Sequence, residues 1–260
     1  MQQRLNLGNQ YTAVNSVTLA QDLMKVNINN KHRLIIMDNK DLYVNIPITE
    51  NIDITTMQLL QHNDPETTAQ ICTLLGVILQ QNYFIFQEKI YQHDKGIAMG
   101  SPISGTIAEL FLQHLEQIYI KPLIHTKHIL FDTRYIDDIF IIYDAEATDH
   151  DYLAQYTNII HSNLQFNPTI ESDGHINFLK LTITGRNTHI EIDVYRKPTT
   201  TYTTIHFTST HPIEHKLVAY RYHITRMLSL PFKTTQQQRE WKLSYILPNK
   251  TASHQQWYTN

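Results

Sequence analysis

The sequence of 260 residues is poor in glycine, in cysteine and in long apolar runs. It has 7 glycines, where an average usage of about 7% would give roughly 18. Its single cysteine, Cys72, excludes an internal disulfide and any zinc knuckle built from several cysteines. No apolar run approaches the roughly 20 residues of a membrane span, and the first residues lack the apolar segment of a signal peptide. We therefore expect an intracellular protein of the nucleus or cytoplasm, neither secreted nor membrane-spanning.

Charge is nearly balanced over the whole chain but unevenly distributed along it. The net charge is −3, which taken alone argues against a nucleic-acid-binding protein. Residues 185–260, however, contain 10 Lys and Arg against 4 Asp and Glu, and residues 1–184 contain 11 against 20. An acidic body with a basic C-terminal part favours a nucleic-acid contact in that part. A chance spread of solvated surface charges is the alternative.

Hydrophobic periodicity and turn residues predict an α+β protein with antiparallel strands. A buried strand is expected at 33–38, and hairpins are expected at 83–92 and 133–144. Residues 176–185 and 189–198 are expected to form two antiparallel strands joined by the turn "GRNT". The expected helices are 65–81, 101–120 (opened by the pair Ser101-Pro102), 149–166 and a basic helix from residue 212 onward.

The hairpin "TRYIDDIFIIYD" (133–144) places Asp137 and Asp138 side by side at its tip, with no glycine to relax the turn. Two like charges ~4 Å apart repel by roughly 4 kcal/mol at an effective dielectric of 20. Full solvation, a raised pKa on one carboxyl, or a bound cation would each relieve that repulsion. A third carboxylate, Asp38, ends the apolar strand 33–38. If the two strands are neighbours, three carboxylates converge, which are ligands that Mg²⁺ prefers; the spacing alone leaves solvation open.

Four motifs in order resemble those of reverse transcriptases. "YIDD" (135–138) resembles their Tyr-x-Asp-Asp box, and "IIMDNKDLYVNIP" (35–47) resembles their first palm motif. "GIAMGSPISGTIAELFLQHLE" (96–116) is similar to the glycine-serine-proline loop and helix between those motifs. "INFLKLTI", followed by "IDVYRKPTTTYTTIHFTSTHPIEHKLVAYRYHITRML", resembles the downstream strands and thumb of the Penelope-like retroelements. The resemblance covers about residues 15 to 230.

The resemblance implies an RNA-directed DNA polymerase with a right-hand palm, an antiparallel sheet with helices on one face, and a small helical thumb. It implies a partial fingers remnant at 1–32, with the fingers largely truncated, a palm at 33–205, and thumb and connection helices at 206–260. Asp38 and Asp137 would hold two Mg²⁺ ions, for which Mn²⁺ could substitute, and Asp138 would support them. The implied partners are an RNA template, a DNA primer and deoxynucleoside triphosphates, and no membrane. The oligomeric state is not implied.

The resemblance also assigns residues to the nucleotide and to the primer-template. Tyr43 would exclude a 2′ hydroxyl, and Met99, Gly100, Ser101 and Pro102 would form the floor beneath the incoming nucleotide. The residues implied to contact the primer-template are Tyr195, Arg196, Lys197, Lys216, Arg221 and Arg226. The last three are spaced by five residues, a rotation of about 140° per step on a helix. We therefore expect about two of those three to touch nucleic acid.

Two positions depart from the pattern of the Penelope-like branch. Lys180 stands where that branch usually has Asp, and Asp41 stands where it has a small polar residue. An alternative function is a catalytically inactive, truncated or repurposed retroelement remnant that only binds nucleic acid. A metal-dependent nuclease is a third possibility, but the sequence shows no obvious base to activate water near the three carboxylates.

Overall fold

The structure is a computed structural model that describes residues 11–126, 129–199, 205–206 and 208–242. Its described residues fall into two compact units, the first within residues 1–12 and 31–171 and the second within residues 13–30 and 172–260. The three-part division expected from the sequence, with boundaries after residues 32 and 205, stays a prediction. Residues 1–10 of the expected fingers remnant and 243–260 of the expected thumb lie outside the described residues.

A four-stranded antiparallel sheet forms the centre of the first unit, with strand order β4-β5-β1-β6. Its strands are β1 (His32–Asn39), β4 (Ile129–Tyr135), β5 (Asp138–Asp144) and β6 (Phe166–Ile170). β1 is central and almost continuously apolar, and Leu34 to Met37, whose side chains alternate between the two faces of the sheet, are all buried. Its register aligns Ile35 with Ile141 of β5 and, at the far end, Asp38 with Asp138.

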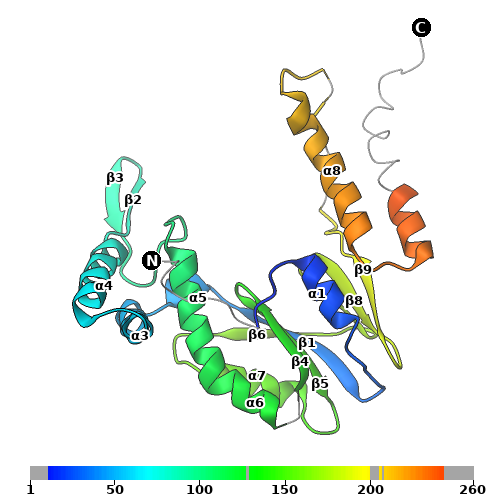
Figure 1. The fold of residues 1–260 in the computed structure, drawn as a ribbon, viewed down its shortest axis with the longest axis horizontal. Helices are drawn as coiled ribbons and strands as arrows, with labels where there is room; N and C mark the ends of the chain where they lie inside the picture. Colours follow the sequence, from blue (N-terminus) through cyan, green and yellow to red (C-terminus); the bar gives the residue numbers. More distant parts are fainter. Residues whose placement is uncertain (1–10, 127–128, 200–204, 207, 243–260) are drawn as a thin grey trace. The chain divides into compact units, whose positions relative to one another are not determined.

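The helices of residues 104–125 and 150–159 lie over one face of this sheet, whereas those of residues 48–60 and 65–80 lie beside them (Figure 1). Alternate residues of the strands, such as Met37 and Ile139, belong to one core cluster with Phe111 of α5 and Leu153 of α7. The elements outside the sheet are α2 (Leu42–Asn45), α3 (Ile48–Leu60), α4 (Pro65–Gln80), α5 (Ser104–Leu115), the π-helical segment η2 (Glu116–Ile120), α6 (Lys121–His125) and α7 (His150–Ile159). A separate hairpin is formed by β2 (Tyr83–Phe86) and β3 (Lys89–Gln92).

In its described residues, the second unit contains a three-stranded antiparallel sheet and helices. The strands are β7 (His175–Phe178), β8 (Leu181–Gly185) and β9 (Ile190–Val194), in that order. The helices are α1 (Ser16–Leu23), capped by the side chain of Asn15, and α8 (Ile213–Ser229). Residues 234–242 are also helical. In the described ranges, no helix has the length and apolar character needed to cross a membrane.

The α+β class with antiparallel strands is confirmed, as are the strand at 33–38, the hairpins at 83–92 and 133–144 and the helices at 65–81 and beyond 212. Several boundaries were wrong; the strand expected at 189–198, for example, ends at Val194. The helix expected at 101–120 begins at Ser104, because Ser101 instead closes a turn with Ala98, and Ser104 Oγ donates to the Ala98 carbonyl at 2.6 Å. It continues as η2 and α6 to His125.

Two further errors concern strands that the hydrophobic periodicity of the sequence did not indicate. The helix expected at 149–166 ends at Ile159, because Phe166 opens β6 and pairs with Asn39 of β1. The single strand expected at 176–185 is two strands, β7 and β8, separated by a turn at Leu179 and Lys180. Both turn residues have positive φ, 47° and 62°, a conformation that neither side chain signals in the sequence.

Candidate active site

Three carboxylates lie together where β1 ends and β5 begins. The antiparallel register sets Asp38 directly opposite Asp138, and Asp137 precedes Asp138 in the turn that joins β4 to β5. The backbone N–H of Asn39 donates to the carbonyl of Asp137 at 3.2 Å, which ties the turn to the end of β1. The structure therefore places at one end of the sheet the three aspartates that the sequence expected to converge, and their catalytic roles stay predictions.

The proximity of these carboxylates changes the acidity of one of them. Burial first, and then the negative charges of Asp137 and Asp38, raise the pKa of Asp138 to about 6. A hydrogen bond with Asp38 also favours the protonated form of Asp138. In the part of the chain that the structure describes, no three His, Cys, Asp or Glu side chains have the spacing of a preformed metal site. Their ligand type and their mutual repulsion nevertheless fit a divalent cation, because carboxylates are the ligands of Mg²⁺ and the cation would relieve the repulsion.

The turn that carries Asp137 is strained. Tyr135 pairs with Asp138, so Ile136 and Asp137 alone connect the two strands, and Ile136 has φ of +56°. Two-residue hairpins usually place Gly or Asn at such a position, and a β-branched residue there is an outlier. Strain of this kind costs about 1–3 kcal/mol and persists only where surrounding contacts enforce it. Isoleucine in this turn therefore requires a neighbouring group that holds the backbone.

Tyr43 and the loop at Met99–Pro102 belong to the same unit as the carboxylates. Tyr43 lies in α2, is half-buried against the core cluster, and accepts a hydrogen bond on its carbonyl from the N–H of Ile97 at 2.8 Å. This backbone contact connects α2 to the loop that leads to Met99. Gly96 makes the contact possible: it has φ of +72°, and a Cβ there would lie 2.4 Å from the carbonyl oxygen of Val44.

The loop itself is open to solvent. Met99 is 70% exposed, and a Cβ placed on Gly100 would meet no atom within 4 Å. Ser101 is half-buried and Pro102 is exposed. Asp41, one of the two departures from the family pattern, is exposed and adopts the left-handed conformation immediately before α2. The structure therefore leaves space above this loop, and the assignment of its four residues to a nucleotide stays a prediction.

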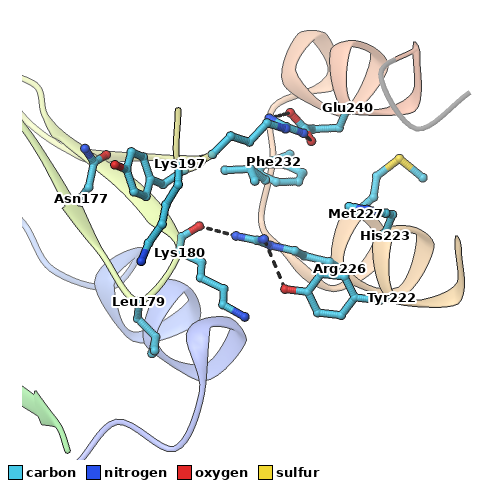
Figure 2. A pocket seen from close by; sticks show the side chains of 13 residues that line it. Asn177, Leu179, Lys180, Lys197, Tyr222, His223, Arg226, Met227, Phe232 and Glu240 are labelled. Carbon is cyan, nitrogen blue, oxygen red and sulfur yellow. Dashed lines mark hydrogen bonds and ion pairs between the residues drawn. The ribbon is translucent and has the colours of Figure 1, made fainter. Parts of the chain in front are cut away.

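The residues expected to contact the primer lie in the second unit. Tyr195 follows β9, and its N–H donates to the carbonyl of Lys180 at 3.0 Å. Arg196 forms a two-pronged ion pair with Glu240, one arm of which measures 2.8 Å, and Lys197 is exposed. These residues line a pocket of about 360 Å³ whose walls come from the β7–β8 turn, the end of β9 and α8 (Figure 2).

The pocket is basic, and some of its cationic side chains interact with neighbouring groups of the protein. Arg226 donates through Nη2 to the carbonyl of Lys180 and through Nη1 to the Tyr222 hydroxyl at 3.4 Å (Figure 2). The ammonium group of Lys180 lies 5.7 Å from the centre of the Tyr222 ring, a cation–π distance. Burial first, and then the charges of Arg196 and Arg226, lower the pKa of His223. The positive charge of this pocket therefore comes from its lysines and arginines.

The three cations expected on the basic helix face different surroundings in α8. Arg221 is exposed. Lys216 is half-buried and donates to the Ser209 carbonyl at 2.7 Å. Arg226 lines the pocket just described. The drift of about 140° per step agrees with these different environments, and which of the three touch nucleic acid stays a prediction.

Sequence reasoning overlooked Arg134, Glu109 and Glu116. Arg134 is 2% exposed and lies between the two glutamates, one in α5 and one at the start of η2. The sequence contained an indication of this cluster. An arginine directly precedes "YIDD", and the two glutamates, seven residues apart, lie on the same face of a helix after two turns. The close approach of Gly96 to the Val44 carbonyl was likewise not predicted from the sequence.

The fold is similar to those of solved polymerases. Telomerase from Candida albicans, in complex with a TWJ fragment of telomeric RNA, matches 94% of this chain and 44% of its own, with 13% identity and a TM-score of 0.64. Telomerase from Candida tropicalis, in complex with the same kind of fragment, matches 96% of this chain and 44% of its own, with 12% identity and a TM-score of 0.55. The Sicinivirus 3Dpol RNA-dependent RNA polymerase matches 91% of this chain and 50% of its own, with 13% identity and a TM-score of 0.50.

No protein-family model and no curated protein sequence matches the chain. The structural matches confirm the expected mixed fold, an antiparallel sheet with helices of the kind found in polymerase palms. The chain spans half or less of the length of each of these three structures.

Proposed function

We propose that this chain is the palm and thumb region of an RNA-directed DNA polymerase, a reverse transcriptase of the Penelope-like type. The observation that carries the proposal is the meeting of Asp38, Asp137 and Asp138 at one end of an antiparallel sheet with a polymerase-palm fold. The reaction is nucleotidyl transfer from a deoxynucleoside triphosphate to the 3′ hydroxyl of a primer paired with an RNA template. The Penelope-like assignment rests on the ordered sequence motifs alone.

The carboxylates would provide the acidic ligands of this site. Asp38 and Asp137 would both contact the same two Mg²⁺ ions, or Mn²⁺ in their place, and Asp138 would support them. The chemistry that two divalent ions supply is activation of the attacking hydroxyl and stabilisation of the leaving oxygens. With pKa raised to about 6, Asp138 accepts a proton more readily than an ordinary aspartic acid, and a neighbouring cation would reverse that preference.

The other predicted residues would position the substrates. Tyr43 lies next to the loop that carries Met99 to Pro102, because the Ile97 N–H binds the Tyr43 carbonyl. That arrangement supports a nucleotide site in which Tyr43 limits space at the 2′ position of the sugar. In the second unit, the basic pocket lined by Lys197 and Arg226 supports contacts with phosphates of the primer-template, which fix position without reading the base.

Primer extension on an RNA template, with Mg²⁺ or Mn²⁺, tests the proposal. Asp137→Asn removes one carboxylate while keeping the shape of the side chain. Because several kcal/mol of transition-state stabilisation depend on such ligands, we expect extension to fall by at least about 100-fold. Asp144→Asn is the matched control: it makes the same substitution at the opposite end of β5 and should leave extension unchanged.

Binding of primer-template, measured by fluorescence anisotropy, separates the alternatives. We expect wild type and Asp137→Asn to bind equally, so that the variant is impaired in the chemical step. If wild type binds primer-template and neither protein extends it, the polymerase proposal is wrong for this chain, and a nucleic-acid-binding remnant remains.

A further inference from the structure

The side chain of Arg134 connects the strained turn of the candidate active site to the helix layer beneath the sheet. Arg134 pairs with Ile139 and therefore faces the helices, whereas its neighbour Tyr135 pairs with Asp138 on the opposite face. Its Nη1 donates to the carbonyl oxygen of Ile136 at 2.9 Å. The one residue with positive φ in this turn is therefore bound from below by a buried guanidinium.

The guanidinium is itself fixed by two carboxylates. Nη1 and Nη2 donate to the two oxygens of Glu109 at 3.0 and 2.9 Å, and Nε donates to Glu116 Oε1 at 2.5 Å. Nη2 also lies within 3.3 Å of the hydroxyl of Thr12 and 3.4 Å of Glu116 Oε2. All the nitrogen atoms of the guanidinium thus have acceptors, in the forked geometry that arginine matches and lysine does not.

This network stays charged although it is buried. Burial opposes the charge of Glu109, but the hydrogen bonds and positive charge of Arg134 outweigh it and hold the pKa of that carboxyl below its usual value. The two glutamates likewise raise the pKa of Arg134 in spite of its burial. This ion pair is more rigid than one at the surface. If it broke, each charged group would be left buried without a partner, which is energetically costly.

Holding the carbonyl of Ile136 fixes the peptide plane between Ile136 and Asp137. That plane sets the direction in which the Asp137 backbone leaves the turn, and the Asp137 carbonyl in turn accepts from the Asn39 N–H, next to Asp38. The bond from Arg134 therefore acts on the relative placement of Asp137 and Asp38. Residues that orient metal-binding carboxylates change metal affinity or activity by about 10- to 100-fold when they are altered.

We propose that Arg134, anchored by Glu109 and Glu116, is a positioning residue that holds the Ile136–Asp137 turn in its strained conformation and so orients the acidic site. The role of the site as a metal centre rests on the proposed function, whereas the control of the turn by Arg134 does not.

Arg134→Lys is the test substitution, because it keeps the buried positive charge but lacks the planar five-donor fork with which Arg134 reaches both glutamates and Ile136. Arg33→Lys is the matched control: Arg33 lies in the same sheet, at the start of β1, and pairs with Glu171 at 3.7 Å. We expect Arg134→Lys to weaken Mn²⁺ binding, measured by electron paramagnetic resonance, by about 10-fold or more. We expect a similar fall in kcat for primer extension, with little change in primer-template affinity, and no effect from Arg33→Lys.

A second substitution separates positioning from simple stabilisation. Ile136→Gly removes the strain of positive φ, so the turn depends less on Arg134. The loss of Mn²⁺ affinity caused by Arg134→Lys should therefore be at least threefold smaller in an Ile136→Gly background. Additive effects of the two substitutions would overturn the proposal.

Hydrogen–deuterium exchange gives a measurement that needs neither metal nor catalysis. Arg134→Lys should accelerate exchange in peptides that contain Asn39 and the turn at 136–138, and leave β1 at Leu34–Met37 unchanged. Uniform acceleration across β1 and β5 would indicate general destabilisation and would refute a positioning role. If wild type neither binds Mn²⁺ nor extends primers, the proposed function fails, and the exchange pattern still decides the role of Arg134.

Discussion

Asp132 makes the stability of this protein depend on pH in an unusual direction. It lies in β4 on the helix-facing side of the sheet, in register with Ile141, and it is half-buried. Burial, and secondly the negative charge of Glu116, raise the pKa of Asp132 to about 7. Its ordinary value is about 3.9. The folded protein therefore keeps a proton on Asp132 over a pH range in which the unfolded chain has lost it.

The sign of the effect follows from proton counting. Between about pH 4 and pH 7 the folded state binds more protons at this position than the unfolded state, so the free energy of unfolding falls as the pH rises. A pKa displaced upward by roughly three pH units corresponds to ~4 kcal/mol, at 1.36 kcal/mol for each unit. Asp132 therefore lowers the free energy of unfolding least below pH 4, and lowers it by the full amount above pH 7.

Asp132→Asn removes the charge and keeps the shape of the side chain. We expect the variant to be more stable than wild type by a few kcal/mol at pH 8 and to show little of this gain at pH 4.5. Urea unfolding followed by circular dichroism at both pH values measures the difference. Leu130→Asn is the control, since it changes an exposed position of the same strand and involves no titrating group. A difference between Asp132→Asn and wild type that does not change with pH would refute the reasoning.

Two further substitutions test the loop beside α2. Gly96→Ala should destabilise the fold by more than about 1 kcal/mol in urea unfolding, because its Cβ would lie 2.4 Å from the Val44 carbonyl oxygen. Gly105→Ala in α5, where a Cβ meets nothing within 4 Å, should instead be neutral or stabilise by up to about 1 kcal/mol. For Tyr43→Ala, we expect more incorporation of ribonucleotides relative to deoxynucleotides in primer extension; an unchanged ratio would contradict the steric role of Tyr43.

The sequence predicted the centre of the candidate site well because strong local patterns determine it. β1 is a short apolar run that ends in a carboxylate, and the hairpin at 133–144 has apolar strands on both sides of its tip. Two antiparallel strands of this kind, laid side by side, bring Asp38 and Asp138 into register. β6 was missed, because Phe166 to Ile170 contains Asn and Pro and becomes a strand only through pairing with β1.

Because glycine is scarce, several turns reach positive φ at residues whose type gives no sign of that conformation in the sequence. In the described residues the Asp173-Gly174 turn carries the usual signal, but the turns at Gln87-Glu88, at Ile136 and at Leu179-Lys180 reach positive φ without glycine. Each of these conformations is unfavourable for the local chain, so it must be stabilised by contacts formed only after folding. For Leu179-Lys180, the Lys180 carbonyl accepts from both Tyr195 and Arg226.

For Ile136, the stabilising contact is the buried guanidinium of Arg134. A glycine at position 136 would adopt this conformation freely, but it would also allow the turn to move, which would loosen the carboxylates on either side. Isoleucine with an arginine beneath it fixes one conformation at the cost of strain, and functional sites are where such strain is found. The two adjacent aspartates without a glycine are thus consistent with a site in which fixed geometry matters more than local stability.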